Sequence, residues 1–153
     1  MDVRRILTAP DRNWHSVPGA SADDLARLEK ASPLPIPEPL LDLLRQTNGG
    51  EGDLALPPLL FVLDTVDDII DGLNDAFLKE EFPQFLFFGG NSGLERIAFD
   101  LRKDTQPLPI VMIDPIAGPE SAETIAPDIE TFIAAIGVEF DDADNASSDK
   151  NGT

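Results

Sequence analysis

The clearest hydrophobic pattern in the chain lies in residues 66–77. The apolar residues of this segment follow the spacing i, i+3, i+4, i+7 and i+11, and aspartates occupy other positions around the same turns. This spacing places the apolar side chains along one face of a helix with about 3.6 residues per turn. We therefore predict one amphipathic helix over residues 66–77, with an inner face formed by Val66, Ile69, Ile70, Leu73 and Phe77.

Two further helices are predicted near the ends of the patterned region. Ser21 can cap a helix over residues 21–31, and the two aspartates that follow it suit the positive end of the helix dipole. A second apolar stripe predicts a helix over residues 127–136, which Gly137 ends.

A fourth helix is predicted over residues 37–47, where leucines form the apolar stripe. It follows residues 32–37, in which alternating prolines favour an extended linker because each proline excludes its predecessor from the helical region. The helix should end at Asn48-Gly49-Gly50, since asparagine and glycine both accept the left-handed conformation of a helix terminus.

Short apolar runs between these helices predict four strands. Residues 85–88 and 95–101 flank Gly89-Gly90-Asn91-Ser92-Gly93, a turn sequence that predicts a β-hairpin. The alternation in the second of these strands places Ile97, Phe99 and Leu101 on one face. The other two predicted strands are residues 59–63 and 110–113.

The order of these elements predicts a single α+β domain, with a mainly antiparallel or mixed sheet packed by about four helices. The predicted domain covers residues 21–140. We expect residues 1–20 to be an irregular segment, because Pro10, Pro18 and Gly19 interrupt them. Residues 141–153 are acidic, small and polar, and this composition predicts a disordered tail.

Charge is the most unusual feature of the composition. Twenty-nine acidic and 11 basic residues give the 153-residue chain a formal net charge of −18. Lysine and arginine supply the affinity for nucleic acid and for anionic membranes, so neither is an expected partner. A basic protein would be attracted to this chain. The alternative is that the acidic charge serves only solubility.

Other compositional features indicate a cytoplasmic protein. No apolar stretch approaches the roughly 20 residues that span a bilayer, and the N-terminal residues lack the apolar region of a signal peptide. The absence of cysteine excludes disulfides and thiolate chemistry.

The sequence contains few candidates for catalysis. His15 is the only histidine, and we expect a structural or solvent-facing role for it. Gly90-Asn91-Ser92-Gly93 is superficially similar to a nucleophile elbow, but Leu94 stands where that motif requires glycine. The aspartates of residues 142–144 lack the glycine and glutamate of a calcium loop. The sequence therefore predicts no enzyme, no metal site and no cofactor.

Several motifs occur in the order found in a known family. A proline-led, leucine-rich helix ends in Asn-Gly-Gly, and an aromatic-glycine turn is followed by an alternating strand that ends in aspartate. Over residues 21–137 the chain resembles the SUKH superfamily, named after a fungal cell-wall assembly regulator and its bacterial relatives. The matching segments are Leu34-Pro35, residues 48–52, Leu60-Phe61, residues 87–93, 97–100, 109–114 and 125–133.

The resemblance implies an α+β fold and no known catalytic residues. Many bacterial members are immunity proteins that neutralise toxins by direct binding, and many of those toxins are nucleases. Fungal members are regulatory scaffolds. The leading hypothesis is therefore a bacterial immunity protein that binds a basic toxin, and the alternative is a regulatory interaction module without a toxin partner. A third class, an enzyme or small-ligand binder, would need a deep pocket where several carboxylates have raised pKa values.

Acidic and polar residues beside the glycine turns are the candidates for contact with a partner, because loops carry recognition on a rigid scaffold. These candidates are Glu51, Asp53, Asn91 and Glu95. We expect a second group to serve backbone geometry at turns and caps, and it comprises Asn48, Gly49, Gly50, Gly89, Gly90 and Gly93.

Overall fold

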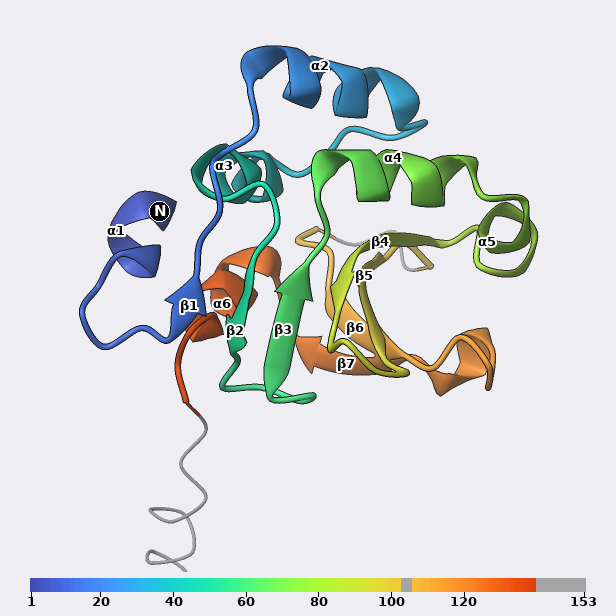
Figure 1. Cartoon of the computed structure of the whole chain (residues 1–153). Helices are drawn as coiled ribbons and strands as arrows, with labels where there is room; N and C mark the ends of the chain where they lie inside the picture. The colour runs from blue at the N-terminus through green and yellow to red at the C-terminus, as the bar shows by residue number, and fades with distance from the viewer. Residues whose placement is uncertain (103–105, 140–153) are drawn as a thin grey trace, which may run out of the picture.

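The computed structural model describes residues 1–102 and 106–139. Its strands form one seven-stranded sheet, in which every strand pairs antiparallel with the next strand along the chain (Figure 1). The sheet is therefore antiparallel throughout the described residues, and the mixed alternative is excluded there. The strands are β1 (Trp14–His15), β2 (Glu51–Asp53), β3 (Leu60–Leu63), β4 (Phe85–Gly90), β5 (Arg96–Asp100), β6 (Ile110–Ile113) and β7 (Glu123–Ala126).

Six α-helices and one short 3-10 helix accompany this sheet in the described part of the chain. The arrangement confirms a single α+β domain, with two more α-helices than the sequence predicts. The helices are α1 (Val3–Leu7), α2 (Ala22–Ala31), α3 (Glu38–Gln46), α4 (Val66–Asn74), α5 (Ala76–Glu81), η1 (Pro119–Ser121) and α6 (Ile129–Ala135).

The N-terminal segment is more regular than its sequence suggests. Instead of an irregular run over residues 1–20, the chain forms α1 and β1 before α2 begins. The Asp2 side chain caps α1 by accepting a hydrogen bond from the backbone N–H of Arg5, and Val3 and Leu7 are buried. This one-turn i, i+4 pair was too short to be recognised as a helix. The tail predicted over residues 141–153 lies outside the described residues.

The predicted helix over residues 66–77 is interrupted at Asp75. This residue ends α4 and caps α5, because its side chain accepts a hydrogen bond of 2.9 Å from the backbone N–H of Leu78. An aspartate can compete in this way with helical hydrogen bonding. As a result, Phe77 leaves the predicted inner face and 56% of its surface is exposed.

Two strand predictions need correction. Gly89 and Gly90 are the last residues of β4 and not the first residues of the turn, so the turn begins at Asn91. Strands β2 and β7 were not predicted, because both are short and partly polar and only pairing with their neighbours identifies them as strands.

The sheet is buried on both of its faces near β4 and β5. On one face, the rings of Phe61, Phe88 and Phe132 contact one another, and residues from α3, α4 and α6 join the same cluster. On the other face, Phe82 packs with Phe85, Phe87, Ala98, Val111 and Ile113. Strand β5 therefore has buried residues on both faces, whereas the alternation of Ile97, Phe99 and Leu101 predicts one buried face.

The N-terminus of α6 offers a test of a helix cap. The Asp128 carboxylate accepts a 2.7 Å hydrogen bond from the backbone N–H of Thr131, and this hydrogen bonding lowers the pKa of Asp128 below its ordinary value of 3.8. We expect Asp128→Ala to cost about 1 kcal/mol of unfolding free energy at pH 7. Asp128→Asn should keep a side-chain oxygen that accepts the capping hydrogen bond, and should lose only the part of the stability that comes from the negative charge.

The pH dependence of this cap has a defined sign. Since the folded pKa is depressed, the contribution of the ionised form is present above pH 3.8 and is lost as the pH falls through the folded pKa. The stability difference between the wild type and Asp128→Asn, measured by urea denaturation, should therefore shrink between pH 7 and pH 3. A difference that is equal at both pH values would contradict this interpretation.

Candidate functional site

Three chain connections lie at the same end of the sheet. In the register, Asp53 pairs with Leu60, Val62 with Gly90, and Arg96 with Ile113. Because all strands are antiparallel, the connections β2–β3, β4–β5 and β6–β7 must leave the sheet at one common end (Figure 1). We call this end the hairpin-tip surface and define it by Asp53, Leu59, Leu60, Asn91, Leu94, Glu95, Ile116 and Glu120.

The hairpin-tip surface exposes four large apolar side chains. The exposed fractions are 42% for Leu59, 37% for Leu60, 59% for Leu94 and 82% for Ile116. Single exposed apolar residues are common on protein surfaces, whereas a group of them beside polar residues is typical of a contact site for another protein. Sequence reasoning missed these four residues, because a local apolar pattern does not show which side chains remain exposed.

Three of the four predicted contact residues belong to this surface. Asn91 and Glu95 are half-buried in the β4–β5 turn, where the Asn91 side-chain amide donates to Glu95 Oε1 at 2.9 Å. The Asn91 Oδ1 atom accepts a hydrogen bond from the backbone N–H of Gly93, and Ser92 takes the left-handed conformation. Asp53 accepts a 2.6 Å hydrogen bond from Asn13. These hydrogen bonds hold the polar side chains of the tips in fixed positions.

Glu51 lies apart from this group. It is exposed on β2, where it pairs with His15 of β1 and Val62 of β3, two residues before Asp53. Glu51 therefore belongs to the body of the sheet, and it is not part of the hairpin-tip surface as defined above.

The Asn48-Gly49-Gly50 segment connects α3 to β2. The Asn48 side chain accepts a 2.8 Å hydrogen bond from the backbone N–H of Val66, which joins this segment to the start of α4. Gly49 and Gly50 have φ angles of 112° and 107°, in the region that side chains disfavour. A Cβ atom on Gly50 would also lie 2.5 Å from the carbonyl oxygen of His15. These contacts favour a structural role for the segment.

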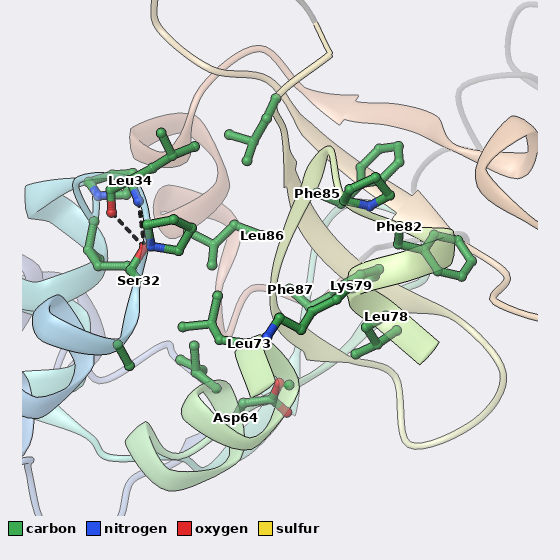
Figure 2. Close-up of a pocket in the computed structure, with 18 of the residues that line it drawn as sticks. Ser32, Leu34, Asp64, Leu73, Leu78, Lys79, Phe82, Phe85, Leu86 and Phe87 are labelled. Atoms are coloured by element: carbon green, nitrogen blue, oxygen red, sulfur yellow. Dashed lines mark hydrogen bonds between the residues drawn. The ribbon is translucent and has the colours of Figure 1, made fainter. Parts of the chain in front are cut away.

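A groove of about 860 Å³ lies between residues 31–37, α4, α5 and the first half of β4 (Figure 2). Its lining is largely apolar and includes Leu73, Leu78, Phe85 and Leu86. The sequence predicts residues 32–37 as a linker, but the groove depends on the distant elements that this linker faces. No local signal could have identified it.

An ion pair lines the groove beside α4. Arg96 Nη2 lies 2.6 Å from Asp64 Oδ2, and the arginine passes over Gly90, where a Cβ atom would lie 3.0 Å from Nη1. Burial raises the pKa of Asp64 above 3.8, and Arg96 opposes that shift. A single carboxylate with a raised pKa and a basic partner is typical of a structural ion pair. The site of an enzyme or small-ligand binder is expected to contain several carboxylates with raised pKa values.

Across residues 1–102 and 106–139, no cluster of three or more histidine or acidic side chains could hold a metal ion. His15 is exposed on β1. Over the same residues, no helix has the length and hydrophobicity needed to cross a bilayer.

The hairpin tips and the apolar groove lie on a single α+β domain. The chain belongs to the SMI1 / KNR4 family (SUKH-1), because the family model matches residues 19–135. This match confirms the resemblance seen in the sequence. No curated protein matches the chain. Membership of the family is consistent with an immunity or interaction module that binds a protein partner, and members of this family are generally non-catalytic.

Proposed function

We propose that this protein is an immunity-type inhibitor that neutralises a basic protein toxin by binding it through the hairpin-tip surface. One observation carries the proposal: four exposed apolar side chains lie in neighbouring connections or at the strand ends beside them, together with Asp53, Glu95 and Glu120. Apolar contacts at the centre with carboxylates around them form the usual anatomy of a protein interface.

The acidic charge supports a basic partner. A net charge of −18 attracts a basic protein before contact and accelerates association at low salt. A nuclease toxin would be one such partner, since its active site must be basic to hold phosphates. The hairpin tips would cover that site, and the cytoplasm of the producing cell is where protection is needed.

Two substitutions on the hairpin-tip surface test the proposal. The chain is co-expressed with the protein encoded by the neighbouring reading frame, and growth rescue and binding are measured. Leu94→Ser combined with Ile116→Ser should weaken binding by about 2–4 kcal/mol, or roughly 30-fold to 1,000-fold, and should reduce growth rescue. The control is Phe77→Ser, which removes from α5 an apolar side chain about as exposed as that of Leu94.

The outcomes separate the candidate functions. Full affinity in a folded double variant would exclude the hairpin-tip surface as the contact site. Failure of the wild type to bind its neighbour or to rescue growth would overturn the immunity function. Binding to a neighbour that is not toxic would favour the regulatory interaction module instead.

A further inference from the structure

The first half of β4 has a free strand edge. Strand β3 pairs with β4 only through Val62–Gly90 and Leu63–Gly89. The chain then leaves the sheet at Asp64, whose backbone N–H donates to the carbonyl of Phe88 at 2.9 Å, and enters α4. In the described part of the chain, residues 85–87 therefore pair with β5 alone.

The pairing register shows which backbone groups face this edge. The backbone N–H of Leu101 donates to the carbonyl of Gln84, and the next bonded pair in the antiparallel alternation is Leu86 with Phe99. Residues between bonded pairs direct their N–H and C=O groups to the opposite side of the strand. Phe87 thus directs its backbone groups away from β5, toward the side where β3 has ended.

This edge lies in the groove between α4, α5 and residues 31–37. Phe85, Leu86 and Phe87 line the groove together with Leu73 and Leu78 from the two helices (Figure 2). Its volume of about 860 Å³ is within the range of about 300–1,000 Å³ for ligand sites. A strand edge beside apolar walls matches an extended peptide, which offers backbone hydrogen bonds and alternating side chains.

The charges in the groove indicate which peptide fits. Arg96 pairs with Asp64, and Arg102 pairs with Asp100 and lies over the ring of Phe85 at 5.0 Å. Asp68 belongs to the capping box of α4. The Lys79 side chain points from α5 into the groove (Figure 2) and forms no ion pair among residues 1–102 and 106–139. Lys79 is therefore the cation that an occupant can still neutralise.

We propose that this groove binds an extended, acidic segment of a partner protein, which adds a strand to β4 along residues 85–87 and places a carboxylate beside Lys79. The proposal does not depend on the hairpin-tip surface, which has the opposite charge preference and lies at the end of the sheet. Backbone pairing would supply affinity, and Lys79 would select the sign of the charge.

A displayed library of random ten-residue peptides provides the probe. Selection on the full-length protein should enrich acidic residues flanked by β-branched residues. One enriched peptide is then synthesised and titrated into ¹⁵N-labelled protein. Amide signals of residues 85–87 and of Lys79 should shift, and hydrogen exchange at the Phe87 amide should slow. A peptide carrying proline where its N–H faces β4 should bind at least about tenfold more weakly, because proline cannot donate that hydrogen bond.

Two matched variants test the charge. Lys79→Glu should weaken binding of the acidic peptide about tenfold, and it should strengthen binding of a peptide with lysine in place of the acidic residue. Lys30→Glu, which makes the same charge change on an exposed residue of α2 outside the groove, should leave binding within about twofold of the wild type.

Three results would overturn the proposal. The first is a selection that enriches no acidic peptide. The second is an enriched peptide that binds the Lys79→Glu and Lys30→Glu variants with equal affinity, or whose affinity does not change when proline replaces the residue whose N–H faces β4. The third is a dimer, detected by sedimentation, that Lys79→Glu disrupts and Lys30→Glu does not, since that result would assign the groove to a second copy of this chain.

Discussion

Alanine in place of Phe88 should lower the free energy of unfolding by about 3–5 kcal/mol. The Phe88 side chain is fully buried, and its ring centroid lies 5.0 Å from that of Phe99, 5.6 Å from that of Phe132 and 6.1 Å from that of Phe61. These neighbours come from β5, α6 and β3. Removal of the ring would thus open a cavity where two strands and a helix meet.

Urea denaturation followed by circular dichroism measures this loss. A protein of this size has a total stability of about 5–15 kcal/mol, so Phe88→Ala risks partial unfolding. Phe88→Leu leaves a smaller cavity and keeps the test informative. Its free energy of unfolding should lie between those of the wild type and the alanine variant. Phe77→Ala is the control, because this ring is 56% exposed and its loss should cost less than about 1 kcal/mol. Equal losses for Phe77→Ala and Phe88→Ala would contradict the described packing.

The second large effect is expected for Arg96→Met, which leaves the Asp64 carboxylate buried without its partner. The expected loss at pH 7.5 is about 1.5–3 kcal/mol, the range for a hydrogen bond to a charged group. It is smaller than the loss for a fully buried ion pair, because 37% of the Arg96 side chain is exposed while only 12% of Asp64 is.

The pH dependence of this variant distinguishes charge from packing. Burial already raises the pKa of Asp64 above 3.8, and the loss of Arg96 should raise it further. For a carboxylate with a raised folded pKa, the native state binds more protons than the unfolded state between the two pKa values, so stability falls as the pH rises through that range. The destabilisation by Arg96→Met should therefore be smaller at pH 5 than at pH 7.5.

A second substitution completes this test. Asp64→Asn in the Arg96→Met background removes the unpaired charge, so part of the lost stability should return at pH 7.5. If Asp64→Asn lowers the stability of that background further, or if the loss is the same at both pH values, packing rather than charge explains the effect of Arg96.

Elements with strong local signals could be predicted from the sequence. Ser21 forms a capping box with Asp24 at the start of α2, and the predicted strand over residues 110–113 has the same bounds as β6. Helix α3, by contrast, ends at Gln46 and is capped by the extended residue Thr47, before the predicted Asn48-Gly49-Gly50 stop is reached. For α2 and β6, one short stretch of chain contains the whole local signal, a capping residue in the first case and an apolar run in the second.

Features that depend on distant neighbours could not be predicted. Residues 51–53 form a strand only because β1 and β3 pair with them. The candidates Asp53, Asn91 and Glu95 lie at one end of the sheet, but the exposed apolar residues beside them appear only once the register is known. The groove likewise depends on where β3 leaves β4, since two further pairs of residues in the same register, Asp64 with Phe88 and Thr65 with Phe87, would cover the edge at Phe87.

The strand order, in which each strand lies next to its neighbour in the chain, has a consequence for the evolution of binding specificity. A change in the length of the turn at residues 91–95 alters the connection between β4 and β5 and requires no new position for any other strand. Exposed turns tolerate such insertions better than paired backbone does. Homologues can therefore vary the sequence and length of their turns to recognise different partners, while the pairing that holds the scaffold together stays the same.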